Sequence, residues 1–539
     1  MTIKNVIILA AGLGSRLTPL TLKVPKGLLE IKENTRILTQ NLKYLENFNN
    51  KIIVTGHKRN KFMGIIQYHN LVEVYNKDFK DTNSLYSLYL ALEQLKKVYT
   101  GGGVYILTSD VIFNKDIFNK KYNNSWINTQ KSKVNKAEWE VIKESKVVKN
   151  FRIRDINQKY ESNTFDFMTG CSYIHDKDLD LFIEEVTKCI INDELKSNSY
   201  WEQALWNILD KINLKTLPCD NYAFEIDNFN DLLTYNPDAP CFKQDIHLRE
   251  IMNVFSIKFD EISNIKPVKQ GMTNDSFTFD IKNKTYIARI PKKSSSDLIN
   301  RYQEKEVYKK ISDLGISEEV LHFITDDFID NPLHGFKIAK FYKNASVANG
   351  QYYQHMKKVM LAFKDLHSKN IKINHEFNLL ERKNYYVKQM GEHYSKISPQ
   401  IRDLEEQFNK IYDWYKSKKY PTHLCLVDTF YENVLILKDG SIKLIDWEYA
   451  GASDGYTDIA GYCLSCVYRE KQVAESLRIY LGRKPTKSEL NRLYAQIIMQ
   501  AILWIFWCEY KKQYQDFYND YEEELILMAN KYLKRLKYE

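Results

Sequence analysis

Short apolar runs alternate with segments of helical periodicity through the first 230 residues. These patterns predict strands near residues 6–9, 52–54 and 104–108 and helices near 37–48 and 85–98. Asn83 or Ser84 is placed to cap the first turn of the last helix. The apolar face of that helix consists of Leu85, Leu88, Tyr89, Leu92 and Leu95. Strands that alternate with helices are typical of an α/β domain with a parallel core.

Pro237 and Pro240 interrupt this alternation. Because proline cannot continue a helix or a central strand, the pair predicts a domain boundary. We therefore expect a first domain over residues 1–235, a linker over 236–255 and a second domain over 256–539. The second domain begins with a strand-rich segment to about residue 345. A mainly helical remainder follows, interrupted by short apolar runs near 423–446.

The composition is that of an ordinary globular protein, with 44% hydrophobic and 27% charged residues. The 78 basic and 69 acidic residues leave a formal charge of +9, without a dense Lys/Arg block. This balance argues against a nucleic-acid partner and indicates a mild attraction for anionic substrates. The eight cysteines are scattered, which predicts reduced and mostly buried thiols.

The chain enters a strand-like run, Ile3 to Ala10, without a basic segment or a cleavage site, so we expect no signal peptide. The most apolar stretch, residues 497–508, is far shorter than the roughly 20 residues of a membrane span. Both features predict a cytoplasmic protein without membrane insertion.

A glycine-rich segment follows the first predicted strand directly, and Pro19, Thr21 and Pro25 follow that segment. Glycines let backbone N–H groups approach a triphosphate, because no Cβ blocks them. The predicted nucleotide cradle consists of Leu9, Ala10, Ala11, Gly12, Gly14 and Ser15. Arg16 and Lys26 supply the charge that holds phosphate oxygens and a leaving pyrophosphate, and are predicted catalytic residues.

This segment resembles the nucleoside-triphosphate transferase family, and within it the bacterial phosphocholine cytidylyltransferases. The resemblance covers about residues 3–232 and recurs at Thr82–Ser87, at Thr108–Asp110 and at Glu225–Asn228. It implies a Rossmann-like domain with a mixed sheet, in which Asn83 and Ser84 bind nucleotide.

The same resemblance implies that Asp110 and Asp227 hold the Mg²⁺ that bridges the nucleotide phosphates, a role that suits hard carboxylate oxygens. The implied reaction is attack by the phosphate of phosphocholine on the α-phosphorus of CTP, with pyrophosphate leaving. A phosphate dianion is already a competent nucleophile, so catalysis would consist of positioning and charge stabilisation.

Five residues lie where the phosphocholine enzymes place aromatic and acidic groups around a quaternary ammonium: Trp139, Tyr173, Tyr200, Trp201 and Glu202. A cation over an aromatic face gains about 0.5–2 kcal/mol. Each of these residues alone is more often part of a hydrophobic core, but their occurrence as a cluster favours a choline pocket.

A second set of motifs lies in the C-terminal half. The loop Gln270–Asn274 stands between predicted strands, Arg289 lies within a strand, and Glu304 on the following helix is placed to pair with Arg289. Asp428, Asn433 and Asp446 follow far downstream.

This order resembles the choline/ethanolamine kinase and aminoglycoside phosphotransferase group, which shares the bilobal α+β fold of protein kinases, over about residues 262–510. The resemblance implies that Asp428 accepts the proton of the substrate hydroxyl and that Asn433 and Asp446 bind Mg²⁺. The residues implied to bind ATP are Gly271, Thr273, Asn274, Arg289 and Glu304.

Leu426 departs from the family, which usually has His two residues before the catalytic Asp. That His packs and orients the loop, and His423 is out of register to replace it. The departure leaves open a nucleotide-binding domain without turnover.

Trp504 and Trp507 share a helix face, and choline kinases enclose trimethylammonium with such a pair and an acidic residue. Glu448 and Tyr449 are the matching residues upstream. The alternative for this motif is a buried helix.

Together these features predict a bifunctional enzyme that phosphorylates choline with ATP and then joins phosphocholine to CTP. Two alternatives remain. The first is the same chemistry on ethanolamine, another amino alcohol or a sugar. The second is a transferase with a kinase-like binding module that does not turn over.

Overall fold

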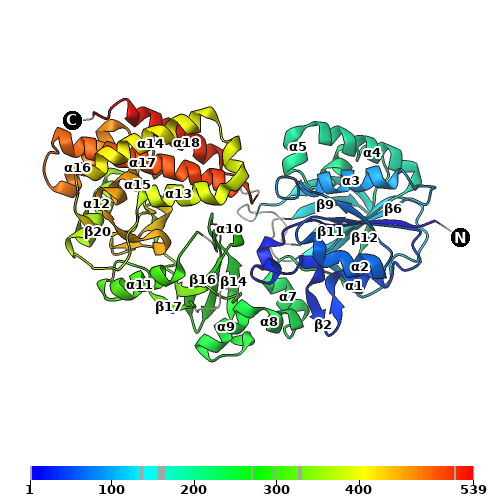
Figure 1. Ribbon diagram of the computed structural model, residues 1–539. Coiled ribbons are helices and arrows are strands. Elements are labelled where there is room, and N and C mark those ends of the chain that lie inside the picture. The colour runs from blue at the N-terminus through cyan, green and yellow to red at the C-terminus, as the bar shows by residue number, and fades with distance from the viewer. Residues whose placement is uncertain are drawn as a thin grey trace. The chain divides into compact units, whose positions relative to one another are not determined.

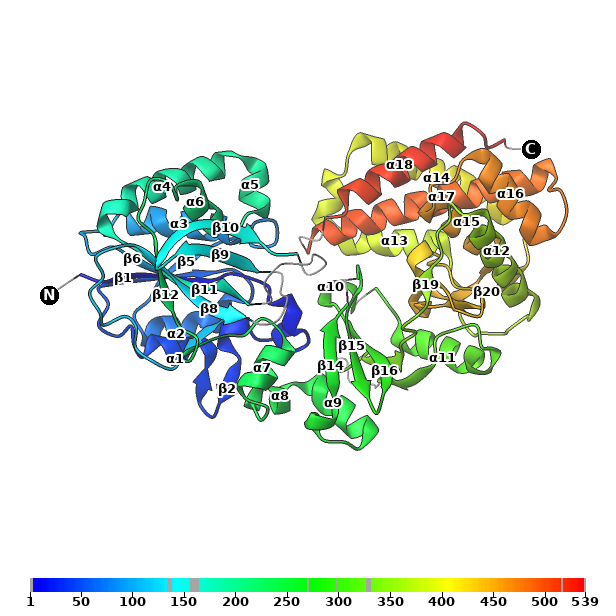
Figure 2. The same cartoon turned by 180° about the vertical axis from the view of Figure 1, so that it is seen from behind.

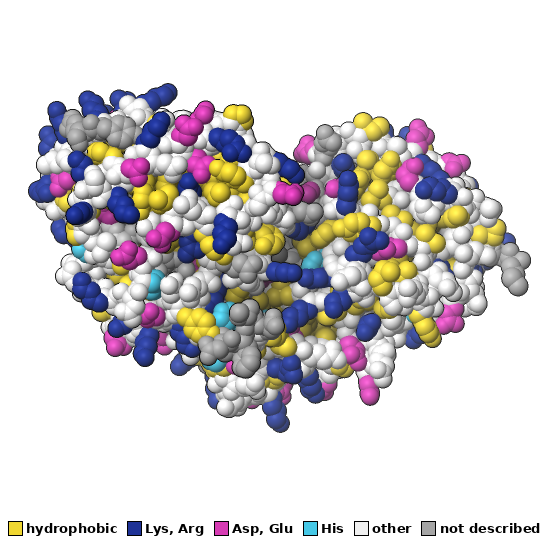
Figure 3. Space-filling model, viewed as in Figure 1, with side chains coloured by type: hydrophobic (Ala, Val, Ile, Leu, Met, Phe, Trp, Pro, Cys, Tyr) yellow, Lys and Arg dark blue, Asp and Glu magenta, His cyan; other side chains and the backbone are white. Residues whose placement is uncertain are grey.

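The computed structural model describes residues 3–132, 138–155, 164–268, 271–296, 298–325, 331–514 and 517–537. The chain forms two compact units, Met1–Val268 and Lys269–Glu539 (Figure 1). No described helix combines the length and the apolar character that crossing a bilayer requires. On the face shown in Figure 3, basic side chains are interspersed with acidic ones over the described part of each unit.

A nine-stranded mixed sheet forms the centre of the first unit. The strands, in spatial order, are β5 (Val72–Tyr75), β4 (Asn50–Thr55), β1 (Asn5–Ala10), β6 (Val104–Thr108), β11 (Phe165–Ile174), β8 (Trp126–Ser132), β12 (Lys215–Pro218), β10 (Val147–Ile153) and β9 (Trp139–Glu144). The first four run parallel, and β11 runs antiparallel to β6 and β8. The predicted α/β fold with a mixed sheet is confirmed.

Helices cover both faces of this sheet, which is why the interior strand β1 is apolar from Val6 to Ala10. α3 (Ser84–Leu95) and α4 (Asp176–Ile191) lie on one face, and α1 (Ile37–Leu42) and α2 (Met63–Tyr68) lie on the other (Figures 1 and 2). The side chains of Val6, Ile7 and Ile8 are completely buried. β1 and β6 are parallel, so their carboxyl ends meet at one edge of the sheet.

The segment predicted as a linker, residues 236–255, is helical, and the chain divides after Val268 instead. Pro240 opens α8 (Pro240–Gln244) in the first turn, where proline is tolerated. Asp245 caps α9 (Ile246–Phe255) by accepting hydrogen bonds from the amides of His247 and Leu248, both at 2.9 Å. Gln244 also donates to Glu30 at 2.7 Å, which ties this segment to the first unit.

The second unit joins a small antiparallel sheet to a large helical part, and the predicted bilobal α+β fold is confirmed. Within this unit the sheet consists, in spatial order, of β15 (Asn274–Ile281), β16 (Lys284–Pro291), β18 (Lys337–Lys340) and β17 (Val320–Phe323). α11 (Arg301–Ile311) belongs to the same lobe. The larger helices of the other lobe are α12 (Tyr353–Ser368), α13 (Leu379–Met390), α14 (Pro399–Ser417), α15 (Tyr456–Ser465), α16 (Glu470–Leu481), α17 (Lys487–Lys512) and α18 (Asn519–Leu533).

α17 is the central helix of the large lobe and is buried on all sides from Ala495 to Lys511. Its apolar stretch is therefore a core helix, as expected for a helix that is hydrophobic all round. The buried amide of Gln500 donates to the Thr457 carbonyl at 2.7 Å, and Gln496 donates to the Tyr415 hydroxyl at 2.8 Å. These bonds satisfy the two amide nitrogens, whereas Gln500 Oε1 is buried without a hydrogen-bond partner among the described residues.

Candidate active sites

A cavity of about 800 Å³ opens at the carboxyl ends of β1 and β6 in the first unit. Gly14 within its cradle has a left-handed φ of +65°, and a Cβ there would lie 2.9 Å from the Thr21 side chain. Glycine is therefore required at this position. The predicted site residues that line the cavity are Leu9, Ala10, Ala11, Gly12, Gly14, Ser15, Arg16, Lys26, Asn83, Ser84, Asp110, Trp139, Tyr200, Trp201, Glu202 and Asp227.

Lys26 lies between the two predicted metal ligands. β7 (Val111–Phe113) and β13 (Ala223–Glu225) pair antiparallel and bring Asp110 beside Asp227. Lys26 Nζ is 2.9 Å from Asp110 Oδ2 and 3.0 Å from Asp227 Oδ1, and Arg16 Nη1 is 3.4 Å from Asp227 Oδ1. Burial opposes the charge of Lys26, but the two carboxylates raise its pKa well above the ordinary value. The cradle thus holds a fixed positive charge where phosphates would lie.

The donors around this lysine fit a divalent cation. Burial acts to raise the pKa of Asp110, but Lys26 and a hydrogen bond from Thr108 lower it, so the carboxylate stays ionised. Its Oδ1 is buried and has no hydrogen-bond partner among the described residues. Oxygens of Glu138, Glu225 and Asp227 lie within 4.8 Å of one another. Mg²⁺ prefers such hard oxygens, so Asp110 and Asp227 would hold it, with Glu138 and Glu225 adjoining. When bound, it would neutralise phosphate charge.

Glu138 and Glu225 were not identified from the sequence. Glu225 opens the Glu225–Asn228 motif but was given no role there, and Glu138 lies outside every motif. Glu138 directly precedes β9 of the nine-stranded sheet, whereas Glu225 ends β13 of a separate two-stranded sheet. Burial, followed by the neighbouring Asp227, Asp110 and Glu138, raises the pKa of Glu225 well above its ordinary value. This end of the cavity therefore concentrates negative charge.

The predicted ammonium-binding residues divide into two groups. Trp139 is half-buried and Tyr200 is 47% exposed, and both line the cavity. Trp201 also lines it but is only 1% exposed and packs edge-on against Phe182, with ring centroids 6.5 Å apart. Burial, with smaller effects of Asp110 and Glu138, raises the pKa of Glu202 to about 8. Its Oε2 is buried and lacks a hydrogen-bond partner among the described residues.

Tyr173 was wrongly placed in this pocket. It lies on β11 opposite Tyr105, with ring centroids 4.8 Å apart, in an aromatic core that also contains Trp126. Its hydroxyl donates to the Gly102 carbonyl at 3.0 Å. Gly170, three residues earlier on the same strand, lines the cavity instead.

In the second unit, Asp428 and Asp446 lie close enough to influence one another. Burial raises the pKa of Asp428 to about 7, with further contributions from Asp446 and Glu448. Asn433 donates from Nδ2 to the Asp428 carbonyl at 3.1 Å, which leaves its Oδ1 as a potential metal ligand. A carboxylate that titrates near neutral pH is suited to accept the proton of an alcohol.

The loop that carries Asp428 is anchored without a histidine at position 426. The amides of Leu426 and Val427 donate to the Asp458 carboxylate at 3.1 and 2.8 Å. His367 Nε2 lies 3.0 Å from the same carboxylate. Leu426 is completely buried, so it fills the position of the usual His by apolar packing. The departure noted in the sequence therefore leaves the loop with a buried hydrogen-bonded anchor.

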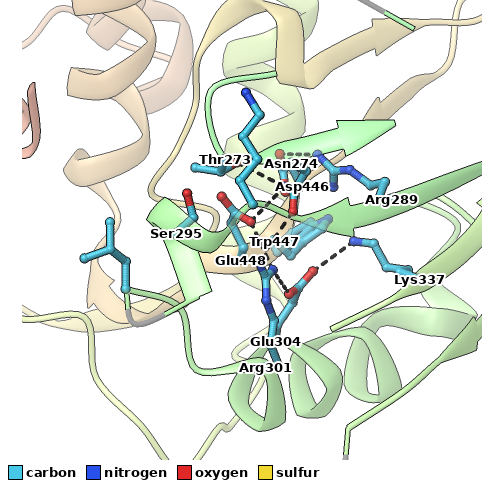
Figure 4. A network of polar contacts seen from close by, with 12 residues as sticks. Thr273, Asn274, Arg289, Ser295, Arg301, Glu304, Lys337, Asp446, Trp447 and Glu448 are labelled. Carbon is cyan, nitrogen blue, oxygen red and sulfur yellow. Dashed lines mark hydrogen bonds and ion pairs between the residues drawn. The ribbon is translucent and has the colours of Figure 1, made fainter. Parts of the chain in front are cut away.

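Six predicted residues join a buried polar network, shown in Figure 4, but not with the predicted pairing: Thr273, Asn274, Arg289, Glu304, Asp446 and Glu448. The expected Arg289–Glu304 pair is not formed. Arg289 instead binds both carboxylate oxygens of Asp446. Glu304 accepts from Lys337 of β18 at 2.9 Å and from Arg301 at 2.7 Å. Burial opposes ionisation of Glu304, but these two cations lower its pKa to about 2.

The nucleotide loop is connected to this network. Asn274 donates to Glu448 at 3.1 Å and to the Thr273 hydroxyl at 3.0 Å, and Arg301 also donates to Glu448 at 3.1 Å. Lys292 donates to the Gly271 carbonyl at 2.7 Å. Gln270 lies outside the described residues. Asp446 and Asn433 offer the hard oxygens that Mg²⁺ prefers, and a cation there would share Asp446 with Arg289.

The predicted ammonium box is brought together only in part. Tyr449 and Trp504 meet edge to face, with ring centroids 5.3 Å apart. Glu448 is adjacent in sequence but is held by Asn274 and Arg301. Trp507 packs on Tyr518 at 5.1 Å, and the Lys511 ammonium lies 5.2 Å from its ring.

Two family models match the chain. The nucleotidyl transferase model matches residues 5–151, and the choline/ethanolamine kinase model matches residues 265–493. The chain is a fusion of a cytidylyltransferase-like domain and a choline kinase-like domain. Both halves thus match families of enzymes, and we call them the transferase and kinase domains.

Curated relatives match one domain each. Choline-phosphate cytidylyltransferase of Haemophilus influenzae is 28% identical over 233 residues, which is 42% of this chain and 94% of that protein. Protein LicA of Haemophilus influenzae is 24% identical over 322 residues, which is 55% of this chain and 85% of that protein. 2-Aminoethylphosphonate cytidylyltransferase of Lancefieldella rimae is 26% identical over 241 residues, which is 43% of this chain and 92% of that protein.

Two solved structures each cover about half of this chain. CTP:phosphocholine cytidylyltransferase from Streptococcus pneumoniae is 22% identical, with a TM-score of 0.39, and the match covers 44% of this chain and 99% of that one. Choline kinase LicA from Streptococcus pneumoniae is 21% identical, with a TM-score of 0.44, and the match covers 54% of this chain and 99% of that one.

The anchor at Asp458 leads to a prediction. Asp458→Ala leaves the Leu426 and Val427 amides without their acceptor, and each unsatisfied buried group costs about 1–3 kcal/mol. We expect a lower melting temperature of the kinase domain and a large loss of ATP-dependent phosphorylation, measured by thermal unfolding and steady-state kinetics. Asp365→Ala is the matched control, because it removes an exposed partner of Lys369 on α12. Indistinguishable melting curves for the two variants would contradict the anchor.

Proposed function

We propose that this chain makes CDP-choline in two steps. The kinase domain transfers the γ-phosphoryl group of ATP to choline, and the transferase domain then joins phosphocholine to the CMP moiety of CTP, releasing pyrophosphate. One observation carries this proposal. A single cavity combines the cations Arg16 and Lys26 with the half-buried or exposed aromatic rings of Trp139 and Tyr200. It also contains the Glu202 carboxyl, whose Oε2 has no hydrogen-bond partner among the described residues. Such a cavity suits a substrate with a phosphate and a quaternary ammonium.

In the transferase step, a phosphate oxygen of phosphocholine attacks the α-phosphorus of CTP. The bond from that phosphorus to the bridging oxygen of pyrophosphate breaks as the new P–O bond forms. Lys26 and Arg16 hold the charge that moves to pyrophosphate, and their positions are fixed in advance by Asp110 and Asp227. A base is not needed because the phosphate dianion carries no proton to remove.

In the kinase step, Asp428 accepts the proton of the choline hydroxyl while that oxygen attacks the γ-phosphorus of ATP, and ADP leaves. With a pKa of about 7, a large fraction of Asp428 is ionised at neutral pH, and the carboxylate still has a high affinity for the proton. The hydrogen bonds of Asp458 to the loop support this role, because they hold the Asp428 backbone in place. This anchor favours turnover over a kinase-like module that only binds.

Aromatic faces bind trimethylammonium without hydrogen bonds, while a primary ammonium needs acceptors. The faces of Trp139 and Tyr200 in the transferase, and of Tyr449 and Trp504 in the kinase, support choline. The second candidate is the same route on a primary amine. The Oε2 of Glu202 favours it, since that oxygen has no partner among the described residues and can accept from an N–H group.

Variants that inactivate one domain test the two-step proposal. Asp110→Asn or Asp227→Asn should abolish CDP-choline formation from supplied phosphocholine and spare ATP-dependent phosphorylation. Asp428→Asn should lower choline phosphorylation by roughly 10²–10⁴-fold, as loss of a general base does, and spare cytidylyl transfer. Mixing the two kinds of variant should restore CDP-choline formation from choline. Product formation at near the wild-type rate by any single variant would refute the role assigned to that residue.

The pH dependence of phosphocholine binding provides another prediction. The pKa of Glu202 is about 8 in the free enzyme, so its carboxyl is mostly protonated at neutral pH. A bound ammonium favours the carboxylate and lowers that pKa, so binding releases a proton. Affinity should therefore rise with pH, by up to about tenfold per unit, and level off above about pH 8.

Glu202→Gln is the control for this profile, since it keeps the shape of the side chain but does not titrate. Titration of the substrate phosphate affects both proteins equally, so the difference between their KM profiles reports Glu202 alone. Superimposable profiles from pH 6 to 9 would remove Glu202 from ammonium binding.

A further inference from the structure

The ammonium of Lys511 is buried at the end of α17, where it bonds to two distant segments of the kinase domain. Its Nζ donates to Ser295 Oγ at 2.6 Å, to Ser294 Oγ at 3.0 Å and to the Ser294 carbonyl at 3.2 Å. It also lies 3.5 Å from the Met272 carbonyl, within the nucleotide loop. The two serines belong to α10 (Lys293–Ser296), which directly follows the strand of Arg289.

Trp507 and Tyr518 complete this arrangement. Trp507 lies one turn before Lys511 on α17, and the ammonium is 5.2 Å from the centroid of its ring. Tyr518 packs on Trp507, with ring centroids 5.1 Å apart, and its hydroxyl donates to the Met272 carbonyl at 3.4 Å. Two donors from the C-terminal helical region therefore reach the same carbonyl of the nucleotide loop.

A buried ammonium is stable only when its N–H groups find acceptors, so Lys511 holds these groups together. We propose that Lys511 is a positioning residue of the kinase reaction, which with Tyr518 fastens the nucleotide loop Gly271–Asn274 to α17. The inference rests on the proposed kinase function. The Lys511 ammonium lies over the ring of Trp507 and blocks that ring for another cation. The ammonium of the amino alcohol therefore binds beside Trp504 and Tyr449 instead.

This assignment separates two tryptophans that lie on one helix face. Trp507 supports the loop that covers the ATP phosphates, and Trp504 meets Tyr449 next to Glu448. Loss of Trp507 should thus affect ATP, whereas loss of Trp504 should affect choline. If both indoles instead enclosed the choline ammonium, loss of Trp504 and loss of Trp507 would raise the KM for choline equally.

The test uses the full chain and steady-state kinetics for ATP and choline. Lys511→Met keeps the length of the side chain and removes its charge. It should raise the KM for ATP by roughly tenfold to a hundredfold, the effect of losing charged hydrogen bonds, while the KM for choline changes by less than about twofold. Lys511→Arg should recover part of the loss. Lys487→Met, at an exposed position of the same helix, should behave as wild type.

Hydrogen exchange of the loop is the second readout, and it does not depend on turnover. In Lys511→Met without substrates, the backbone amides of residues 272–274 should exchange faster than in the wild type. Ser295→Ala removes one acceptor and should shift the exchange rate and the KM for ATP in the same direction by a smaller factor. This variant keeps the test decisive if Lys511→Met does not fold.

Two results would overturn the proposal. One is wild-type loop exchange and an unchanged KM for ATP in Lys511→Met, or in Ser295→Ala if the first variant unfolds. The other is a choline-specific KM defect in Trp507→Ala that equals that of Trp504→Ala. If the wild type phosphorylates no amino alcohol, the proposed function fails, and loop exchange together with ATP binding by calorimetry still decides whether Lys511 fastens the loop.

Discussion

A charge that leaves water must be paired, and this constraint organises both catalytic centres. In the transferase domain the Lys26 ammonium bridges Asp110 and Asp227, which come from distant parts of the chain. In the kinase domain Arg289 binds Asp446, and Glu304 binds Lys337 and Arg301. Each pair fixes a strand end or a loop relative to its neighbours. The groups that chemistry requires are thereby held in place before substrate arrives.

Glu202 and Asp428, one in each centre, have no ion pair among the described residues, and the pKa of each is raised, as is that of Glu225. Glu202 lies in the transferase cavity with a pKa near 8, and Asp428 lies in the kinase centre with a pKa near 7. Burial is the main cause in each. Their proposed roles differ, because Glu202 would pair with a cation of the substrate and Asp428 would accept a proton. The proposed route is chemically coherent, since the proposed product of the kinase domain is the proposed substrate of the transferase domain.

Residues within contiguous motifs could be predicted from the sequence. The cradle from Leu9 to Ser15 and the order of Asp428, Asn433 and Asp446 are read directly along the chain, because one loop or hairpin positions each set. Residues whose role depends on distant packing could not. Glu138, Lys337, Asp458 and Lys511 reach their sites from separate elements. The prediction that Tyr173 lines the pocket was wrong for a related reason. The sequence around Tyr173 does not show which part of β11 borders the cavity.

The most direct test of the two-step account is a product analysis of the wild-type chain with isotope-labelled choline, ATP, CTP and Mg²⁺. Mass spectrometry over a time course should show labelled phosphocholine first and labelled CDP-choline second, with one ADP and one pyrophosphate per CDP-choline. Omitting CTP should stop the series at phosphocholine, and omitting ATP should stop it at choline. Labelled choline that stays unmodified, while supplied phosphocholine is converted to CDP-choline, would contradict the account.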